Sequence, residues 1–143
     1  MTPEPITLER SFNAPLSKIW KALTDSKEMK KWYFDIEDFR TEVGFEFHFT
    51  AGSEQQKYTH LCKVTEVIPE KRLSYSWRYE NYAGNSEVTF ELFAEGGNTR
   101  LKLTHSGIET FPQGSRDFAR ESFTAGWTHI IGISLKDYLE ATA

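Results

Sequence analysis

The chain has 143 residues, of which 38% are hydrophobic and 27% charged, and its formal net charge is −4 at pH 7. These values fit one globular domain spanning residues 1–143, and they exclude a general nucleic-acid binder, which needs an excess of basic residues to displace counterions from phosphates. No stretch approaches the roughly 18 to 20 apolar residues of a membrane span, and the N-terminus lacks the basic start and apolar run of a signal peptide.

The first part of the chain predicts one strand and two short helices. Residues 6–12 alternate in polarity, which is typical of a strand. A helix is expected over 15–24, where a proline begins an apolar pattern at helical spacing. A second helix is expected over 26–32, because Asp25 followed by Glu28 has the form of a capping box.

From residue 36 onward the apolar period changes to two, which indicates a run of strands. Short turns separate these strands, including Asn81–Asn85 and the hairpin signal Gly96-Gly97-Asn98, so we expect an antiparallel meander with one buried face. The alternating stretches are residues 45–50, 58–68, 73–79, 88–93 and 101–105.

The helical period returns after a loop over residues 107–114. A long helix is expected from about residue 115 to 141, with one apolar stripe that includes Phe123 and Trp127. A one-sided sheet needs a cover for its apolar face, and only this helix is long enough to supply it. A glycine inside a helix costs roughly 1 kcal/mol relative to alanine, so we expect Gly126 to mark a close approach of the helix to another backbone.

Several motifs, taken together and in this order, resemble the SRPBCC or START-like superfamily, and within it the group related to the C-terminal domain of the heat-shock-protein-90 ATPase activator. They are Phe12-Asn13-Ala14-Pro15 with Ile19–Asp25, then Val64–Leu73, Tyr75-Ser76-Trp77, Gly126-Trp127, and Leu135 with Tyr138-Leu139-Glu140. The resemblance implies an α+β helix-grip fold. In that fold a curved antiparallel sheet of about six to seven strands wraps around a long C-terminal helix, with two short N-terminal helices beside it.

The resemblance also implies a cavity between the sheet and the long helix. Members of the superfamily bind lipids, sterols, polyketides or hormones there, whereas the chaperone activator works through protein contacts. Aromatic residues make up 15% of the chain, and such side chains line apolar ligand pockets as well as ordinary cores. The candidate ligand-binding residues are Tyr75, Trp77 and Tyr79, with Phe90, His60, His105, Phe123 and Trp127. We expect Trp127 to line the inner end of a modest pocket with Trp77 and Phe90.

The sequence contains no catalytic motif and no metal-binding or cofactor-binding motif. The only thiol, Cys62, lies inside a predicted strand, where it is expected to be buried and inert. A single cysteine allows no intrachain disulfide and agrees with a reducing compartment, so we expect a cytoplasmic protein. His60 and His105 share strand faces with apolar residues. They either reach the cavity, as hydrogen-bonding groups or bases, or are satisfied by backbone or water.

Three hypotheses follow for the function. The first is non-catalytic binding of a small apolar or aromatic molecule. The second is a protein-interaction domain with a chaperone partner, acting in a stress response, and it predicts a small or absent cavity and an exposed apolar patch. The third is a cyclase, dehydratase or hydrolase that uses the same cavity, and it requires two or more polar residues that converge in the pocket, with His60 and His105 as the best candidates.

Overall fold

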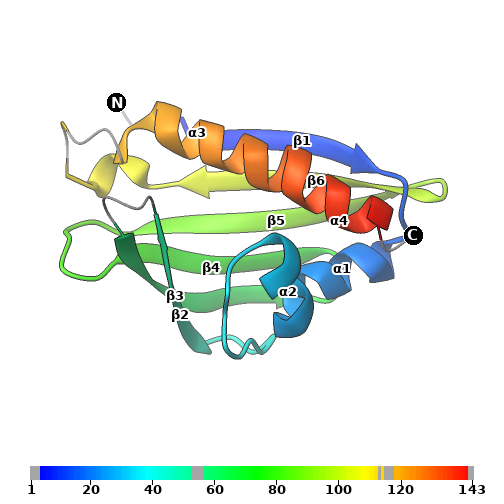
Figure 1. Cartoon of the computed structure of the whole chain (residues 1–143), viewed down its shortest axis with the longest axis horizontal. Coiled ribbons are helices and arrows are strands. Elements are labelled where there is room, and N and C mark those ends of the chain that lie inside the picture. The colour runs from blue at the N-terminus through cyan, green and yellow to red at the C-terminus, as the bar shows by residue number, and fades with distance from the viewer. Residues whose placement is uncertain (1–3, 53–56, 113, 115–117, 142–143) are drawn as a thin grey trace.

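The computed structural model describes residues 4–52, 57–112, 114 and 118–141. Within these ranges a six-stranded antiparallel sheet curves around one long helix, which confirms the expected helix-grip architecture (Figure 1). The strand order is β1-β6-β5-β4-β3-β2, so β1 and β2 form the two edges. The strands are β1 (Ile6–Phe12), β2 (Glu46–Gly52), β3 (Lys57–Ile68), β4 (Arg72–Tyr79), β5 (Ser86–Glu95) and β6 (Asn98–Ser106).

Alternation along each strand separates a buried concave face from an exposed convex face. In β4, Tyr75, Trp77 and Tyr79 are buried, whereas Arg78 is exposed. The pairing of β3 with β4 shifts register between Val64 and Glu66, and a bulge of this kind bends the strand that carries it. The concave face thus becomes the floor of a groove that a helix can fill.

Two short helices, α1 (Leu16–Thr24) and α2 (Ser26–Trp32), lie beside the C-terminal end of the long helix (Figure 1). Asp25 caps α2, because its side chain accepts a hydrogen bond from the Lys27 backbone N–H at 2.9 Å. The predicted capping box is not formed. The Asp25 N–H donates to the carbonyl of Lys21, and the Glu28 carboxylate accepts from the Tyr138 hydroxyl instead.

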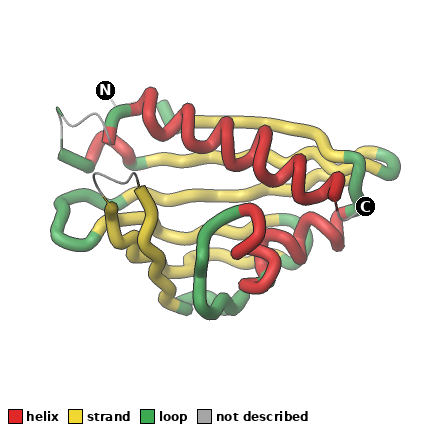
Figure 2. Tube along the Cα trace, viewed as in Figure 1, coloured by secondary structure: helices red, strands yellow, loops and turns green. Residues whose placement is uncertain are grey.

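The C-terminal helix consists of α3 (Arg120–His129), a π-helical segment η3 (Ile130–Leu135) and α4 (Lys136–Ala141). It covers the concave face of the sheet as a second layer (Figure 2). The helix begins at Arg120, later than the predicted start near residue 115, because Ala119 has an extended backbone; residues 115–117 lie outside the described residues. No helix among the described residues is long and apolar enough to cross a membrane.

The π-helical segment follows from the spacing of the apolar stripe. The buried residues recur every fourth position, at Phe123, Trp127, Ile131, Leu135 and Leu139. In an α-helix of 3.6 residues per turn each such step overshoots one turn by about 40°, so four steps would rotate the stripe by roughly 160°. A π-helix, with its i→i+5 hydrogen bonds, has more residues per turn and removes part of that rotation. All five side chains therefore stay on the sheet.

The segment between α2 and β2, residues 33–45, is a loop, although the sequence suggested that the strand period begins at residue 36. It contains no strand, and its buried members Ile36 and Phe39 are three residues apart rather than two. Ile36 is fully buried. The loop thus contributes side chains to the core from outside both the sheet and the helix.

Two loops pack together where β4 ends and β6 ends. Gly84 and Gly107 have φ values of 105° and 86°, which favour glycine. A Cβ on Gly84 would lie 2.5 Å from the Thr110 carbonyl oxygen, and one on Gly107 would lie 2.9 Å from the Asn85 carbonyl oxygen. The predicted loop after β6 contains a short 3-10 helix, η1 (Ile108–Thr110), that makes this contact.

Candidate functional site

A pocket of about 290 Å³ opens between the N-terminal half of the long helix and the ends of β2, β3 and β4. Thirteen of the described residues line it, and seven of these carry aromatic rings of phenylalanine, tyrosine or tryptophan. Its volume lies just below the range of roughly 300–1,000 Å³ for small-molecule sites. The lining residues are Phe34, Ala51, Gly52, Tyr58, His60, Trp77, Tyr79, Phe118, Ser122, Phe123, Gly126, Trp127 and Ile130.

Strand register and helix spacing bring these residues together. His60 on β3 pairs with Tyr79 on β4, and Tyr58 on β3 pairs with Ala51 on β2, so the four side chains form one patch of the concave face. Across from them, the long helix presents Ser122 and Gly126 from α3 and Ile130 from the start of η3, at intervals of four residues, which places the three on one side of the helix. The pocket is the space between this patch and that side of the helix.

Gly126 does not mark a close approach of two backbones, and that expectation was wrong. Apart from its chain neighbours and the adjacent backbone of its own helix, a Cβ on Gly126 would meet no atom within 4 Å. The glycine instead lies in the pocket wall between Ser122 and Ile130, where any larger side chain would extend into the open space. The glycine that destabilises the helix thus lies at the point where the core is left unfilled.

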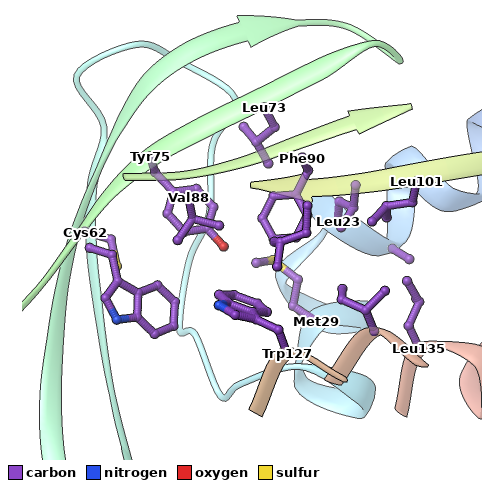
Figure 3. Packing of buried hydrophobic residues seen from close by; sticks show 14 of the residues in the cluster. Leu23, Met29, Cys62, Leu73, Tyr75, Val88, Phe90, Leu101, Trp127 and Leu135 are labelled. Carbon is purple, nitrogen blue, oxygen red and sulfur yellow. The ribbon is translucent and has the colours of Figure 1, made fainter. Parts of the chain in front are cut away.

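Trp127 points from the helix toward the sheet and forms the inner wall of the pocket (Figure 3). Its ring centroid is 5.5 Å from that of Trp77, which also lines the pocket, and 6.1 Å from that of Phe90. The expected partnership of Trp127 with Trp77 is therefore present. Phe90 packs behind Trp127 and does not reach the pocket surface.

His105 lies behind this wall, in a chain of buried hydrogen bonds. The Trp127 indole N–H donates to Nδ1 of His105 at 3.0 Å, and Nε2 of His105 lies 2.8 Å from the Ser86 hydroxyl. Because the Ser86 hydroxyl donates its own proton to the Trp77 carbonyl at 2.7 Å, it accepts from Nε2, so His105 is a neutral imidazole protonated on Nε2. Burial lowers the pKa of His105 to about 3.

His60 is a lining residue of the pocket, and it too is neutral at pH 7. Its Nδ1 lies 3.1 Å from the carbonyl oxygen of Tyr58, so Nδ1 carries the proton in the neutral ring. Its ring stacks on that of Phe49 with centroids 4.4 Å apart. Burial lowers the pKa of His60 to about 4, against smaller opposing effects of the backbone of Tyr58 and Phe49.

The two histidines do not form a catalytic pair. They lie on β3 and β6, with β4 and β5 between them. The ring of Trp77 contacts both rings, with centroids 4.9 Å from His60 and 5.7 Å from His105. Both ring nitrogens of His105 have protein partners, which leaves no nitrogen to act as a base. The cooperation that an enzyme of this kind would need is not supported by the geometry.

Five of the eight predicted site residues line the pocket, namely His60, Trp77, Tyr79, Phe123 and Trp127. The other three, Tyr75, Phe90 and His105, are buried on the same concave face but lie outside the lining. Strand parity alone assigns all of them to one face. It does not tell which positions the rest of the chain covers.

The loop over residues 33–45 is the cover that the sequence did not reveal. Phe34 stacks on Phe49 with centroids 4.3 Å apart and lines the pocket. The Tyr33 hydroxyl lies 2.6 Å from that of Tyr75, and burial raises the pKa of both phenols. This loop therefore fills the inner part of the groove and leaves only the outer part open.

Phe118, Tyr58 and Ser122 also line the pocket without having been singled out from the sequence. Tyr58 opens an alternating stretch, and Ser122 stands four residues before Gly126, so strand parity and helix spacing were available signals for these two. Phe118 stands outside any periodic pattern. Its ring packs 5.2 Å from Tyr58 and 4.9 Å from Tyr79, measured between centroids.

The described residues offer no group of three or more histidine, cysteine, aspartate or glutamate side chains that could hold a metal ion. Cys62 is buried, and burial raises the pKa of its thiol, so little of it is thiolate at neutral pH. The groups in the pocket are rings, hydroxyls and one neutral imidazole. Such a site can surround and orient a mostly apolar molecule.

A family model described as Activator of Hsp90 ATPase homolog 1-like protein matches residues 13–140. Among solved structures, MLL2253 from Mesorhizobium loti is 27% identical with a TM-score of 0.78, over 97% of this chain and 98% of that one. BH1534 from Bacillus halodurans is 28% identical with a TM-score of 0.74, over 96% of this chain and 99% of that one.

DynU16, a protein of the dynemicin biosynthetic locus, has a TM-score of 0.80 at 21% identity, which shows a common fold. The match covers 98% of this chain but 48% of that one, so the chain spans about half of its length. No curated protein sequence matches the chain.

Proposed function

Because the chain belongs to the family of Activator of Hsp90 ATPase homolog 1-like proteins, within the SRPBCC/START-like superfamily, we propose that it binds a small hydrophobic or aromatic ligand between its sheet and its C-terminal helix, without catalysing a reaction on it. The supporting observation is the open aromatic pocket beside Gly126. Apolar space left unfilled in a core is destabilising, and so is a glycine inside a helix. The unfilled apolar space and the helical glycine both occur at Gly126. Such a combination of two destabilising features is expected where a binding site is kept open.

The absence of a supported catalytic arrangement favours binding over chemistry. Of the two histidines, His105 is enclosed by Trp127 and Ser86, and no other described residue of the lining titrates close to neutral pH beside His60. A general base needs a pKa near the working pH to be efficient, and both values lie well below it. We therefore keep the cyclase-type or hydrolase-type alternative below ligand binding.

A dye-binding experiment tests the proposal. The neutral naphthalene dye 2-acetyl-6-dimethylaminonaphthalene is titrated into the protein, and its emission reports an apolar environment. In the variant Gly126→Leu the new side chain occupies the pocket, whereas Ala125→Leu places the same side chain at the exposed neighbouring position. We expect Gly126→Leu to weaken dye binding at least tenfold and Ala125→Leu to leave it unchanged. Equal binding by both variants would refute the proposal.

The family name supplies a second candidate, a protein-interaction role directed at a chaperone. The large exposed hydrophobic residues lie on separate segments of the described chain, at Val43, Ile68, Tyr82, Phe93 and Ile133. A measurable change in the ATPase rate of purified Hsp90 on addition of the protein, retained in Gly126→Leu, would favour this role over ligand binding.

A further inference from the structure

We propose that the pocket selects an electrically neutral aromatic ligand and rejects the corresponding carboxylate. The inference rests on the proposed function, because it concerns the class of ligand that the same site accepts. It depends on three features of the described residues: the absence of charge in the lining, the state of the helix end that faces the pocket, and the position of the nearest arginine on that helix.

The described lining contains no aspartate, glutamate, lysine or arginine. Its one residue that titrates near neutral pH is His60, which burial holds in the neutral form. Behind the wall, His105 is neutral as well, and both of its nitrogens are engaged with Trp127 and Ser86. Among the described residues, a bound anion would find no opposite charge either in the wall or directly behind it.

The start of α3 borders the pocket, and a helix N-terminus can attract an anion through its free N–H groups. Here the two residues of the first turn that line the pocket, Ser122 and Phe123, have N–H groups that are already bonded. The N–H groups of Ser122 and Phe123 donate to the carbonyl oxygen of Ala119, at 3.1 and 3.2 Å. The helix end therefore does not offer these donors to a ligand in the pocket.

Arg120, the first residue of α3, is directed elsewhere. Its guanidinium donates to the backbone carbonyl oxygens of Glu4 and Pro5, at 2.6 and 3.3 Å. These contacts tie the helix to the chain just before β1. The arginine is thereby kept in a structural role away from the pocket lining.

An ionised carboxylate in such a pocket would lose its hydration without gaining an ion pair, which is strongly unfavourable. A neutral amide or ketone loses much less hydration. The seven aromatic rings of the lining give a neutral aromatic ligand extensive contact. Aromatic faces also attract cations, so a cationic probe is needed to separate a general preference for neutral molecules from a cation site.

Three probes of nearly the same shape provide the test: naphthalene-2-carboxamide, naphthalene-2-carboxylate and naphthalene-2-carboxamidine. Each is titrated at pH 7 into the full chain by calorimetry. In parallel, the indole N–H signals of 15N-labelled protein are followed, because Trp77 and Trp127 line the pocket whereas Trp20 does not. The Gly126→Leu variant confirms that each measured affinity belongs to the pocket.

We expect the amide to bind at least about tenfold more tightly than either charged probe and to shift the signals of Trp77 and Trp127. A carboxylate that binds as tightly as the amide, with the same two signals shifted, would overturn the inference while leaving the proposed function intact. An amidine that binds more tightly than the amide would also overturn it and identify a cation site. If no probe binds or shifts these signals, both the inference and the proposed function fail.

Discussion

Acidification should unfold this protein through its two buried histidines, and His60→Phe should remove a defined part of that effect. In the unfolded chain a histidine has a pKa of about 6.5, whereas burial lowers the pKa to about 4 for His60 and about 3 for His105. Between these values the unfolded state binds more protons than the folded state, so the free energy of unfolding falls as the pH falls. The stabilisation is present above pH 6.5 and is lost progressively toward pH 4 for His60 and pH 3 for His105.

The size of the effect follows from the pKa differences. Between pH 7 and pH 5 each buried histidine should lower the free energy of unfolding by about 2 kcal/mol, so the pair should account for about 4 kcal/mol. That is a large part of the 5–15 kcal/mol that typically holds a domain folded. His60 is 6% exposed and His105 is fully buried, so solvent screening reduces these figures little.

Urea unfolding, followed by circular dichroism at pH 7 and pH 5, measures the loss for each variant. His60→Phe keeps a ring against Phe49 and Trp77 but has no proton to gain, so its loss between the two pH values should be about 2 kcal/mol smaller than that of the natural chain. His48→Gln, at an exposed position on the convex face, is the control for removing a histidine. An unchanged loss in His60→Phe would refute the burial of a neutral histidine in the pocket wall.

Two further predictions concern the long helix, and a third concerns the buried hydrogen bond between Ser86 and His105. Gly126→Ala should raise the free energy of unfolding by about 1 kcal/mol and the melting temperature by roughly 4 °C, because the added methyl group meets no atom within 4 Å; a lower melting temperature would contradict this. Deleting the exposed Ile133 shortens the interval between Ile131 and Leu135 from four residues to three, which offsets the rotation of the stripe in a regular α-helix, and should preserve cooperative unfolding, whereas an alanine inserted after it should rotate Leu135 off the sheet and cost about 2–5 kcal/mol in thermal unfolding. Ser86→Ala leaves the His105 Nε2–H buried without an acceptor, so urea unfolding should show a loss of about 1–3 kcal/mol, while Ser106→Ala, at an exposed position, serves as the control.

The fold could be predicted from the sequence because its apolar residues follow two clear repeats. They recur at every second position in the strands and at about every fourth position in the long helix. Alternation in β4 assigned Tyr75, Trp77 and Tyr79 to the concave face, and burial confirms that assignment. The length of the final helical stretch identified the cover of the sheet. Each of these inferences depends on residues that are neighbours in sequence, where local spacing carries the information.

The candidate site could be predicted only in part, because it depends on contacts between distant segments. Parity placed His60 and His105 on the same face, but only the position of Trp127 decides that His105 is enclosed and His60 is not. The sequence singled out Gly126, but the reason expected for it, a close contact with another backbone, was wrong. A glycine beside an unfilled space and a glycine at a close contact look the same in a sequence. Phe34 lies in an aperiodic loop and gave no signal.

The loop that carries Tyr33 and Phe34 limits the size of the pocket. These rings close the inner end of the groove, yet residues 33–45 contribute no strand to the six-stranded sheet and no turn to the long helix. The volume of the pocket therefore depends on a segment that takes no part in the hydrogen bonds between the strands of the sheet. Substitutions there can enlarge or shrink the pocket while the architecture stays constant, so proteins sharing this fold at 21–28% identity need not share a ligand.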